Sequence, residues 1–233
     1  MHTLYLVSTP IGNRADISIR ALETLWNVDV ILCEDTRTTQ ELLNTYKSRF
    51  DRPYPKLLSY NDHNRDRRIP AVLDLLIKGQ DVALVSDQGT PILSDPGYGL
   101  TKEIYKLNDP KIVVEVIPGA NALLPALQLS GFPPDRFFFA GFLPKSDKRR
   151  REMIANFPST TVIIYESPRR IRELLEQTCD VLGPEKKVAI CRELTKKHQE
   201  ALRGSVDDLL GIDLKERVKG EVVVVIDNNP QKG

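Results

Sequence analysis

Two carboxylates lie in a stretch of the chain that is otherwise rich in Gly, Pro, Ser and Thr. They are Asp87 and Asp95, and the stretch, 86–99, follows a short apolar run at 82–85. Glycines let a backbone approach a ligand closely, and prolines stiffen its path. The stretch contains no Lys or Arg, although a polyphosphate cradle normally has a basic side chain beside its glycines. It therefore predicts a preorganised loop that repels ATP and accepts a cationic ligand.

A sulfonium cofactor such as S-adenosylmethionine fits this charge pattern. Asp can hold hydroxyl groups or an amino group, while exposed backbone N–H groups take a carboxylate. The alternative for the loop alone is an acidic turn with Asx caps and no ligand. Asp95 precedes Pro96 and Gly97. It is expected to cap the next helix, so that Asp95→Asn costs stability more than ligand affinity.

Alternating strands and helices are predicted to position this loop. Apolar runs in the first half indicate strands at 4–8, 28–33, 56–59, 82–85 and 112–117. Helical periodicity falls between them, at 17–27, 38–46, 71–77 and 100–107. This spacing is typical of βαβ units around a parallel sheet, whose ligands lie beyond the carboxyl ends of the strands. Loops of unusual composition would meet at that edge, which favours a site over separate turns; they are 8–16, 34–39, 86–99 and 118–121.

Two α/β domains are predicted, residues 1–117 with a mainly parallel sheet and residues 118–233 with a mixed arrangement. In the second, strands are expected at 137–142, 161–165, 187–191, 199–203 and 221–226. Helices are expected at 121–129, from 148 onward, at 170–182 and at 206–210.

The overall composition excludes several classes of protein. The 233 residues carry a net charge of +1, so any nucleic-acid site must be a local patch. The run 145–151, which is dominated by Lys and Arg, is the clearest one. The 3 cysteines and 3 histidines lack metal-ligand spacing, which predicts no metal site and reduced thiols in the cytoplasm. No signal peptide and no membrane span are expected.

A series of short motifs runs through the whole chain. The first half contains Ser-Thr-Pro-Ile-Gly-Asn (8–13), Glu-Asp-Thr-Arg (34–37), Asp-His-Asn (62–64), Ser-Asp-Gln-Gly-Thr-Pro (86–91) and Ser-Asp-Pro-Gly (94–97). The second half contains Gly-Phe-Leu-Pro-Lys (141–145), Tyr-Glu-Ser-Pro-Arg-Arg (165–170), Arg-Glu-Leu-Thr-Lys (192–196) and Lys-Gly-Glu (219–221). In this order the set resembles the ribosomal RNA small subunit methyltransferase I family, a branch of the tetrapyrrole methylase superfamily.

The resemblance implies an α/β class III S-adenosylmethionine-dependent methyltransferase fold, with two α/β domains and the cofactor cleft between them. It also implies a homodimer that methylates the ribose 2′-oxygen of a cytidine in the decoding region of 16S rRNA, in the small ribosomal subunit, leaving S-adenosylhomocysteine. The cofactor contacts implied by the matching motifs are Thr9, Pro10, Asp87, Gly89, Thr90, Pro91, Ser94, Pro118, Gly119, Tyr165, Leu194, Thr195 and Gly220. This chain departs from the family at the hinge, where Ala120 and Asn121 follow Pro-Gly.

Methylation of a 2′-hydroxyl needs help in removing its proton, from a general base or from a cation that stabilises alkoxide character. The ionisable residues at motif positions are therefore catalytic candidates. They are Glu34, Asp35, Glu166 and Lys196, and Glu193 is a further ionisable residue at a motif position. The alternative for Glu34 and Asp35 is a carboxylate pair at a helix N-terminus.

Contacts with RNA are expected from basic and amide side chains. The candidates are Arg37, Asn61, His63, Asn64, Lys145, Lys148, Arg149, Arg150, Arg151, Arg169 and Arg170. Such basic clusters are more often solvated helix surface. Two other functions stay open from the sequence: methylation of a tetrapyrrole or corrinoid precursor, and a nonenzymatic nucleotide- or RNA-binding module.

Overall fold

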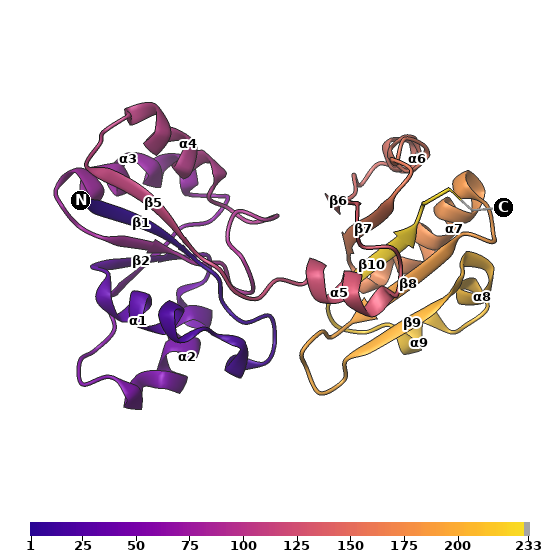
Figure 1. The fold of residues 1–233 in the computed structure, drawn as a ribbon, viewed down its shortest axis with the longest axis horizontal. Helices are drawn as coiled ribbons and strands as arrows, with labels where there is room; N and C mark the ends of the chain where they lie inside the picture. The colour runs from indigo at the N-terminus through magenta and orange to yellow at the C-terminus, as the bar shows by residue number, and fades with distance from the viewer. Residues whose placement is uncertain (231–233) are drawn as a thin grey trace. The chain divides into compact units, whose positions relative to one another are not determined.

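The computed structural model describes residues 1–230, and the chain forms two compact units that meet in sequence between Asn121 and Ala122 (Figure 1). The predicted division after residue 117 falls at the end of the last strand of the first unit. Each unit has its own sheet and its own hydrophobic core.

The N-terminal unit alternates strands with helices. Its strands are β1 (His2–Val7), β2 (Val30–Cys33), β3 (Lys56–Ser59), β4 (Val82–Leu84) and β5 (Ile112–Ile117). Its helices are α1 (Ile19–Asn27), α2 (Thr36–Tyr46), α3 (Arg65–Ile77) and α4 (Tyr98–Leu107). The strand order is β3-β2-β4-β1-β5, and every neighbouring pair is parallel. The predicted parallel sheet is confirmed.

Burial on both faces explains the apolar runs in the central strands. Every residue of β2 and β4 is buried, as expected for a parallel sheet covered by helices on both sides. The helices α1 and α2 lie on one side of the sheet and α3 and α4 on the other (Figure 1). Ser18 begins α1 by accepting a hydrogen bond from the Ala21 N–H at 3.0 Å, and the helix then buries Leu25 and Trp26.

The C-terminal unit contains a mixed sheet. Its strands are β6 (Phe137–Phe142), β7 (Thr161–Glu166), β8 (Lys187–Arg192), β9 (Glu200–Ser205) and β10 (Val222–Asp227). Its helices are α5 (Leu123–Ser130), α6 (Asp147–Ala155), α7 (Ile171–Leu182), α8 (Val206–Leu210) and α9 (Leu214–Arg217). The strand order is β6-β7-β10-β8-β9, with β6 parallel to β7 and the other pairs antiparallel. The predicted mixed arrangement is confirmed.

Helices cover both faces of this second sheet as well. Alternate residues such as Val162 and Ile164 join the core with residues of α6, α7 and α8. The opposite face packs against α5, where the Cys191 thiol lies 3.6 Å from the Ala126 carbonyl oxygen. None of the helices within residues 1–230 is both long enough and apolar enough to cross a membrane.

Candidate functional site

The loops that follow the strands of the N-terminal sheet leave at one edge, because all five strands are parallel. Short hydrogen bonds join these loops. The backbones of Thr9 and Gly89 exchange two hydrogen bonds, at 2.9 and 3.1 Å. The hydroxyls of Ser8 and Thr90 lie 3.0 Å apart, and the Thr90 hydroxyl also donates to the Ala120 carbonyl at 3.1 Å. The predicted meeting of the loops after β1, β4 and β5 is confirmed.

Two of the predicted cofactor residues must be glycine for this arrangement to form. Gly89 has a φ of +85°, and a Cβ there would lie 3.1 Å from Cγ2 of Ile11. A Cβ on Gly119 would lie 2.9 Å from Cβ of Ser8. The loops thus approach one another backbone to backbone. Ser8 was absent from the predicted site residues, although it begins the Ser-Thr-Pro motif.

The rest of the loop after β4 is turned sharply and is partly strained. Ile92 and Ser94 have φ values of +76° and +68°, in the left-handed region that non-glycine residues seldom adopt. Strain of this kind concentrates at functional sites, where the surrounding structure maintains it. Ser94 is exposed, whereas Pro10 and Pro91 are buried and hold the loop bases. The structure therefore fixes the conformation of the stretch, as its prolines predicted.

A cluster of three carboxyl groups lies at this edge, and none of them has its ordinary pKa. Burial raises the pKa of Glu34, of Asp87 and of Asp95, and the negative charges of neighbouring carboxylates raise each of them further. The Asp87 carboxylate is fixed by a hydrogen bond from the Asp35 backbone N–H at 3.0 Å. No group of His, Cys, Asp and Glu among the described residues has the geometry to hold a metal ion. This edge of the sheet is therefore acidic, and its three carboxyl groups bind protons more strongly than ordinary carboxyl groups do.

Asp35 differs from its neighbour Glu34. It is the N-cap of α2, and its carboxylate accepts the Arg37 backbone N–H at 2.8 Å and the Arg37 guanidinium Nε at 3.0 Å. These hydrogen bonds lower the pKa of Asp35 to about 2. The helix N-terminal role, considered for both residues, is confirmed for Asp35. Arg37 is exposed but already paired with this carboxylate.

The expectation that Asp95 caps the next helix is wrong. The N-cap of α4 is Gly97, with a φ of +146°, and no side chain accepts a hydrogen bond there. A Cβ on Gly97 would lie 2.7 Å from Cγ1 of Ile92, so tight packing rather than capping begins the helix. Asp95 stays within the loop, where burial raises its pKa.

The predicted cofactor residues of the C-terminal unit also collect at one edge of their sheet. Val222, the first residue of β10, pairs with Glu166 at the end of β7 and with Arg192 at the end of β8. Tyr165, Leu194, Thr195 and Gly220 therefore lie at the same end of the sheet.

The loop after β8 is held in a strained conformation by its neighbour across the sheet. Glu193 and Thr195 have φ values of +49° and +64°. Gly220 has a φ of +84°, which favours glycine, and a Cβ there would lie 2.1 Å from Oε1 of Glu193 and displace that side chain. The Glu193 backbone N–H donates to the Glu221 carbonyl at 2.9 Å, and the Glu221 N–H donates to Oε1 of Glu193 at 2.9 Å.

Lys196 is fixed as an ammonium in this loop. Its Nζ lies 3.2 Å from Oε1 of Glu193 and 3.0 Å from Oε2 of Glu221. Burial works to lower the pKa of Lys196, but hydrogen bonds to the two carboxylates outweigh it and raise the pKa. Burial works to raise the pKa of Glu193, but hydrogen bonds from the Glu221 backbone N–H and from Lys196 outweigh it and lower the pKa. The sequence indicated Lys196 as a site residue. It did not indicate Glu221 as the partner of Lys196, because the two residues are far apart in the sequence and come together only in the folded chain.

Two predicted site residues are instead a buried ion pair. The side chains of Arg150 and Glu166 are both fully buried, with Nη2 3.2 Å from Oε2. Glu166 also accepts the Arg170 guanidinium at 2.6 Å and the Ser167 backbone N–H at 2.7 Å, while Arg150 also pairs with Glu173 at 3.2 Å. The assignment of Arg150 to RNA contact and that of Glu166 to catalysis are therefore wrong, because neither side chain reaches solvent.

The remaining basic candidates differ in how far their charge is already neutralised. Arg151 pairs with Asp147 and with Asp180, and Arg170 is held by Glu166. Lys148 is exposed and 4.0 Å from Glu152. By contrast, three exposed side chains have no carboxylate partner within residues 1–230, namely Lys145, Arg149 and Arg169.

The amide candidates organise the turn after β3. The Asn64 side-chain oxygen accepts the Asn61 N–H at 3.0 Å, and the Asn61 side-chain oxygen accepts the His63 N–H at 3.2 Å. Since β3 belongs to the parallel sheet, this turn lies at the same edge as the acidic cluster. His63 is exposed there.

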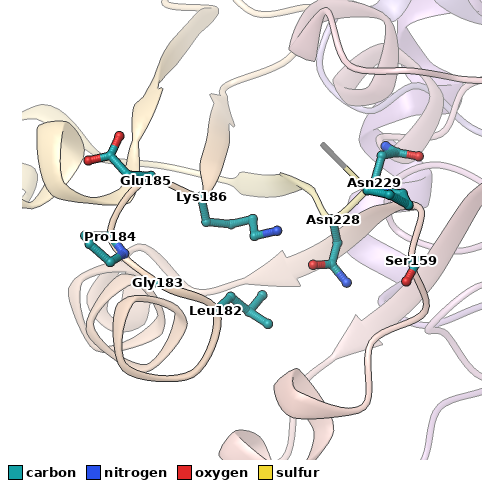
Figure 2. Close-up of a pocket in the computed structure, with 9 residues that line it drawn as sticks. Ser159, Leu182, Gly183, Pro184, Glu185, Lys186, Asn228 and Asn229 are labelled. Carbon is teal, nitrogen blue, oxygen red and sulfur yellow. The ribbon is translucent and has the colours of Figure 1, made fainter. Parts of the chain in front are cut away.

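A pocket of about 590 Å³ lies at the other end of the C-terminal sheet (Figure 2). Ser159 precedes β7, Lys186 precedes β8, and Asn228 follows β10. Figure 2 shows the Lys186 ammonium directed toward Asn228 and the Glu185 carboxylate pointing away. None of the predicted site residues lines this pocket, so it is separate from the candidate site.

Comparison with known proteins identifies the family. Residues 3–210 match the family model described as Tetrapyrrole (Corrin/Porphyrin) Methylases. A protein of Thermotoga maritima named ribosomal RNA small subunit methyltransferase I is 44% identical over 97% of this chain and 98% of its own. A protein of the same name from Mesorhizobium japonicum is 46% identical over 96% of this chain and 74% of its own.

Solved structures of low sequence identity share the fold. A cobalt precorrin-4 methyltransferase from cobalamin biosynthesis superposes with a TM-score of 0.66 at 16% identity, over 98% of this chain and 96% of that one. A diphthine synthase superposes with a TM-score of 0.70 at 13% identity, over 97% and 89%. With its two α/β units and its near full-length relatives, the chain belongs to the tetrapyrrole methylase family, in the branch of the ribosomal RNA small subunit methyltransferases I.

Proposed function

We propose that this protein transfers a methyl group from S-adenosylmethionine to the ribose 2′-oxygen of a cytidine in the decoding region of 16S rRNA. The observation that carries the proposal is the 44% identity, over 97% of the chain, to a protein named ribosomal RNA small subunit methyltransferase I. We further propose that it works in the cytoplasm, as a homodimer, on the small ribosomal subunit.

The N-terminal edge suits S-adenosylmethionine in its charge, because three carboxyl groups lie there. Gly89 and Gly119 let their loops pack closely against Ile11 and Ser8, which fixes the backbone groups that we propose to face the ligand. Thr9 and Thr90 use their hydroxyls to hold the loops. Asp87, half-buried in the loop after β4, is the carboxylate proposed to hold a cofactor hydroxyl or amino group. Pro10, Pro91, Ser94 and Pro118 complete this set.

The C-terminal unit supplies the second set of proposed cofactor contacts. Tyr165, Leu194, Thr195 and Gly220 lie at one end of its sheet, and the strained loop after β8 holds Thr195 in place. When bound, S-adenosylmethionine supplies an electrophilic methyl group on a positively charged sulfur. The residues of this chain must then orient the ribose oxygen in line with that methyl.

The pKa shifts distinguish the candidates for proton removal. Asp35 has a pKa of about 2 and is occupied as a helix cap, which makes it a poor base. Glu34 has a raised pKa and no hydrogen-bonded cation among the described residues, so it accepts a proton more readily near neutral pH. We assign Glu34 as the proton acceptor. Lys196, held as an ammonium, is assigned to stabilise negative charge on the oxygen.

Transfer of labelled methyl tests this function against its two alternatives. The purified protein would be incubated with labelled S-adenosylmethionine in two parallel reactions. One contains small ribosomal subunits from cells lacking the gene, and the other contains a corrinoid precursor. We expect label in the RNA only. Label in the corrinoid would establish the macrocycle methylase instead.

A nonenzymatic module is tested by the same preparation. We expect S-adenosylmethionine and S-adenosylhomocysteine, but not ATP, to raise the unfolding temperature. Stabilisation by ATP alone, without methyl transfer to either substrate, would contradict the proposal.

A further inference from the structure

The C-terminal unit carries an aromatic surface at the end of its edge strand. Phe139, Phe142 and Tyr165 form one group there, with ring centroids of Phe139 and Tyr165 4.9 Å apart and those of Phe142 and Tyr165 5.7 Å apart. Phe142 is 58% exposed. A large apolar side chain this exposed on a sheet edge indicates a binding surface when the side chains around it suit the same kind of ligand.

A β-bulge aims Phe142 at this surface. Along β6, Phe139 pairs with Ile163, Gly141 with Ile164 and Phe142 with Tyr165, so the register shifts by one residue between Phe139 and Gly141. Gly141 takes a φ of +64° at the bulge. Side chains normally alternate between the faces of a sheet, and the extra residue turns Phe142 to the face of Phe139 and Tyr165.

Three cations without a carboxylate partner in residues 1–230 follow the strands β6 and β7 at the same end of the sheet. Because β6 and β7 are parallel, the loops that follow Phe142 and Tyr165 leave at the same edge. The first loop contains Lys145 and leads into α6 with Arg149, and the second contains Arg169. These three side chains are exposed and have no carboxylate partner within the described residues. Aromatic rings beside cations of this kind suit an unpaired nucleotide, whose base stacks and whose phosphates pair.

We infer that Phe142 is a stacking platform for an unpaired base of the RNA substrate, with Lys145, Arg149 and Arg169 holding the flanking phosphates. The inference rests on the proposed function for the identity of the RNA. It adds that the protein reads a single-stranded segment, since a base inside a duplex cannot stack on a side chain. Phe142 binds and positions the RNA and takes no part in the chemistry.

Binding of a single-stranded RNA of about 12 nucleotides, a length within the range of single-strand sites, tests the inference without reference to methylation. We expect Phe142→Leu to weaken binding about tenfold, the scale of one lost stack, and Phe142→Tyr to retain the wild-type affinity. Binding of the same sequence as a duplex should not distinguish the variants. Phe137→Leu is the matched control, because Phe137 is 41% exposed on the same strand but at its other end.

The outcomes separate this inference from the proposed function. Equal single-strand binding by wild type and Phe142→Leu, or an equal loss in Phe137→Leu, would overturn the stacking role even if small subunits are methylated. A tenfold loss confined to Phe142→Leu supports it even if wild type methylates no ribosomal RNA. Because Phe142 contacts Tyr165, S-adenosylmethionine affinity is measured in each variant, and it should stay within about twofold of wild type; a parallel loss of cofactor and RNA affinity counts against stacking.

Discussion

Glu34 and Asp35 adjoin in sequence, yet their surroundings shift their pKa values in opposite directions. Burial raises the pKa of Glu34, while hydrogen bonds from Arg37 lower that of Asp35 to about 2. Sequence identifies both as an acidic pair but cannot tell which one a helix will use as its cap. The structure makes that distinction, and the proposed proton acceptor follows from it.

Glu34→Gln should reduce the rate of methyl transfer by about 10²- to 10⁴-fold, the range for a lost general base, with cofactor affinity nearly unchanged. Single-turnover transfer and calorimetric titration measure the two quantities. In wild type the rate should fall as pH drops through the raised pKa of Glu34, because the protonated carboxyl cannot accept a proton. That acidic limb should be absent in the variant.

Asp35→Asn is the matched control for this change. Asn caps helices as well as Asp does, so its rate should stay within a few-fold of wild type. An equal loss of rate in both variants, or none in Glu34→Gln, would remove Glu34 from the mechanism.

Asp87→Asn should separate cofactor binding from stability. Asn keeps an oxygen to accept the Asp35 N–H, but it lacks the charge, so we expect S-adenosylmethionine affinity to fall about tenfold, the scale of a charged hydrogen bond. The unfolding midpoint, followed by the fluorescence of Trp26 in the same unit, should be unchanged or higher at pH 7. Burial raises the folded-state pKa of Asp87, so the charged form destabilises the fold, and any gain should shrink as pH falls through that pKa.

Asp95→Asn provides the comparison in the same loop. The pKa of Asp95 is raised for the same reason, so the effect on stability should have the same sign, while cofactor affinity stays within about twofold. Equal losses of affinity in the two variants would contradict the specific role of Asp87.

At the scale of the element, α6 illustrates what a run of like charges conceals. Adjacent residues on a helix point about 100° apart, so Arg149 faces solvent while Arg150 is buried with Ile154 one turn later. In the sequence, the basic run 145–151 looks like a uniformly solvated face. The partner that buries Arg150 is Glu166, which lies on β7 and is distant in the sequence. No local pattern in the sequence reveals a pair that only the packing of α6 against the sheet brings together.

Arg150→Met should therefore change the stability of the protein, and Arg149→Met should change its affinity for RNA. Arg150→Met removes one of the two guanidinium groups that pair with the buried Glu166, so it should lower the free energy of unfolding by about 1.5–3 kcal/mol, the scale of a hydrogen bond to a charged group, measured by circular dichroism in urea. Arg149→Met should change it by less than about 0.5 kcal/mol but reduce RNA affinity and its salt dependence. Similar stability in both variants would contradict the buried pair.

The elements themselves could be predicted wherever a periodic apolar pattern reached their ends. The strands β3, β5 and β6 and the helix α8 have the predicted bounds. The helix α3 begins at Arg65, ahead of the predicted residue 71, because its first turns are charged and show no periodicity. The four-residue α9 is too short for a periodic signal, and it was missed.

At the scale of the whole molecule, the two units differ in how far their sites could be predicted. The parallel N-terminal sheet follows from alternating strands and helices, and a parallel sheet alone brings the loops after its strands to one edge. The C-terminal strands give no such rule, because their mixed directions depend on β10 entering between β7 and β8. Tyr165 and Gly220 were therefore predicted from the resemblance, and the register of β10 supplies the physical reason for their shared position.

The most direct test of the central claim is a map of ribose methylation in the 16S rRNA of cells with and without this gene. Protection of the RNA backbone from alkaline cleavage marks each 2′-O-methyl group. We predict that one cytidine in the decoding region is protected only when the gene is present, and that the gene for the Glu34→Gln variant does not restore it. An identical map in the two strains, or a difference confined to base methylation, would contradict the account.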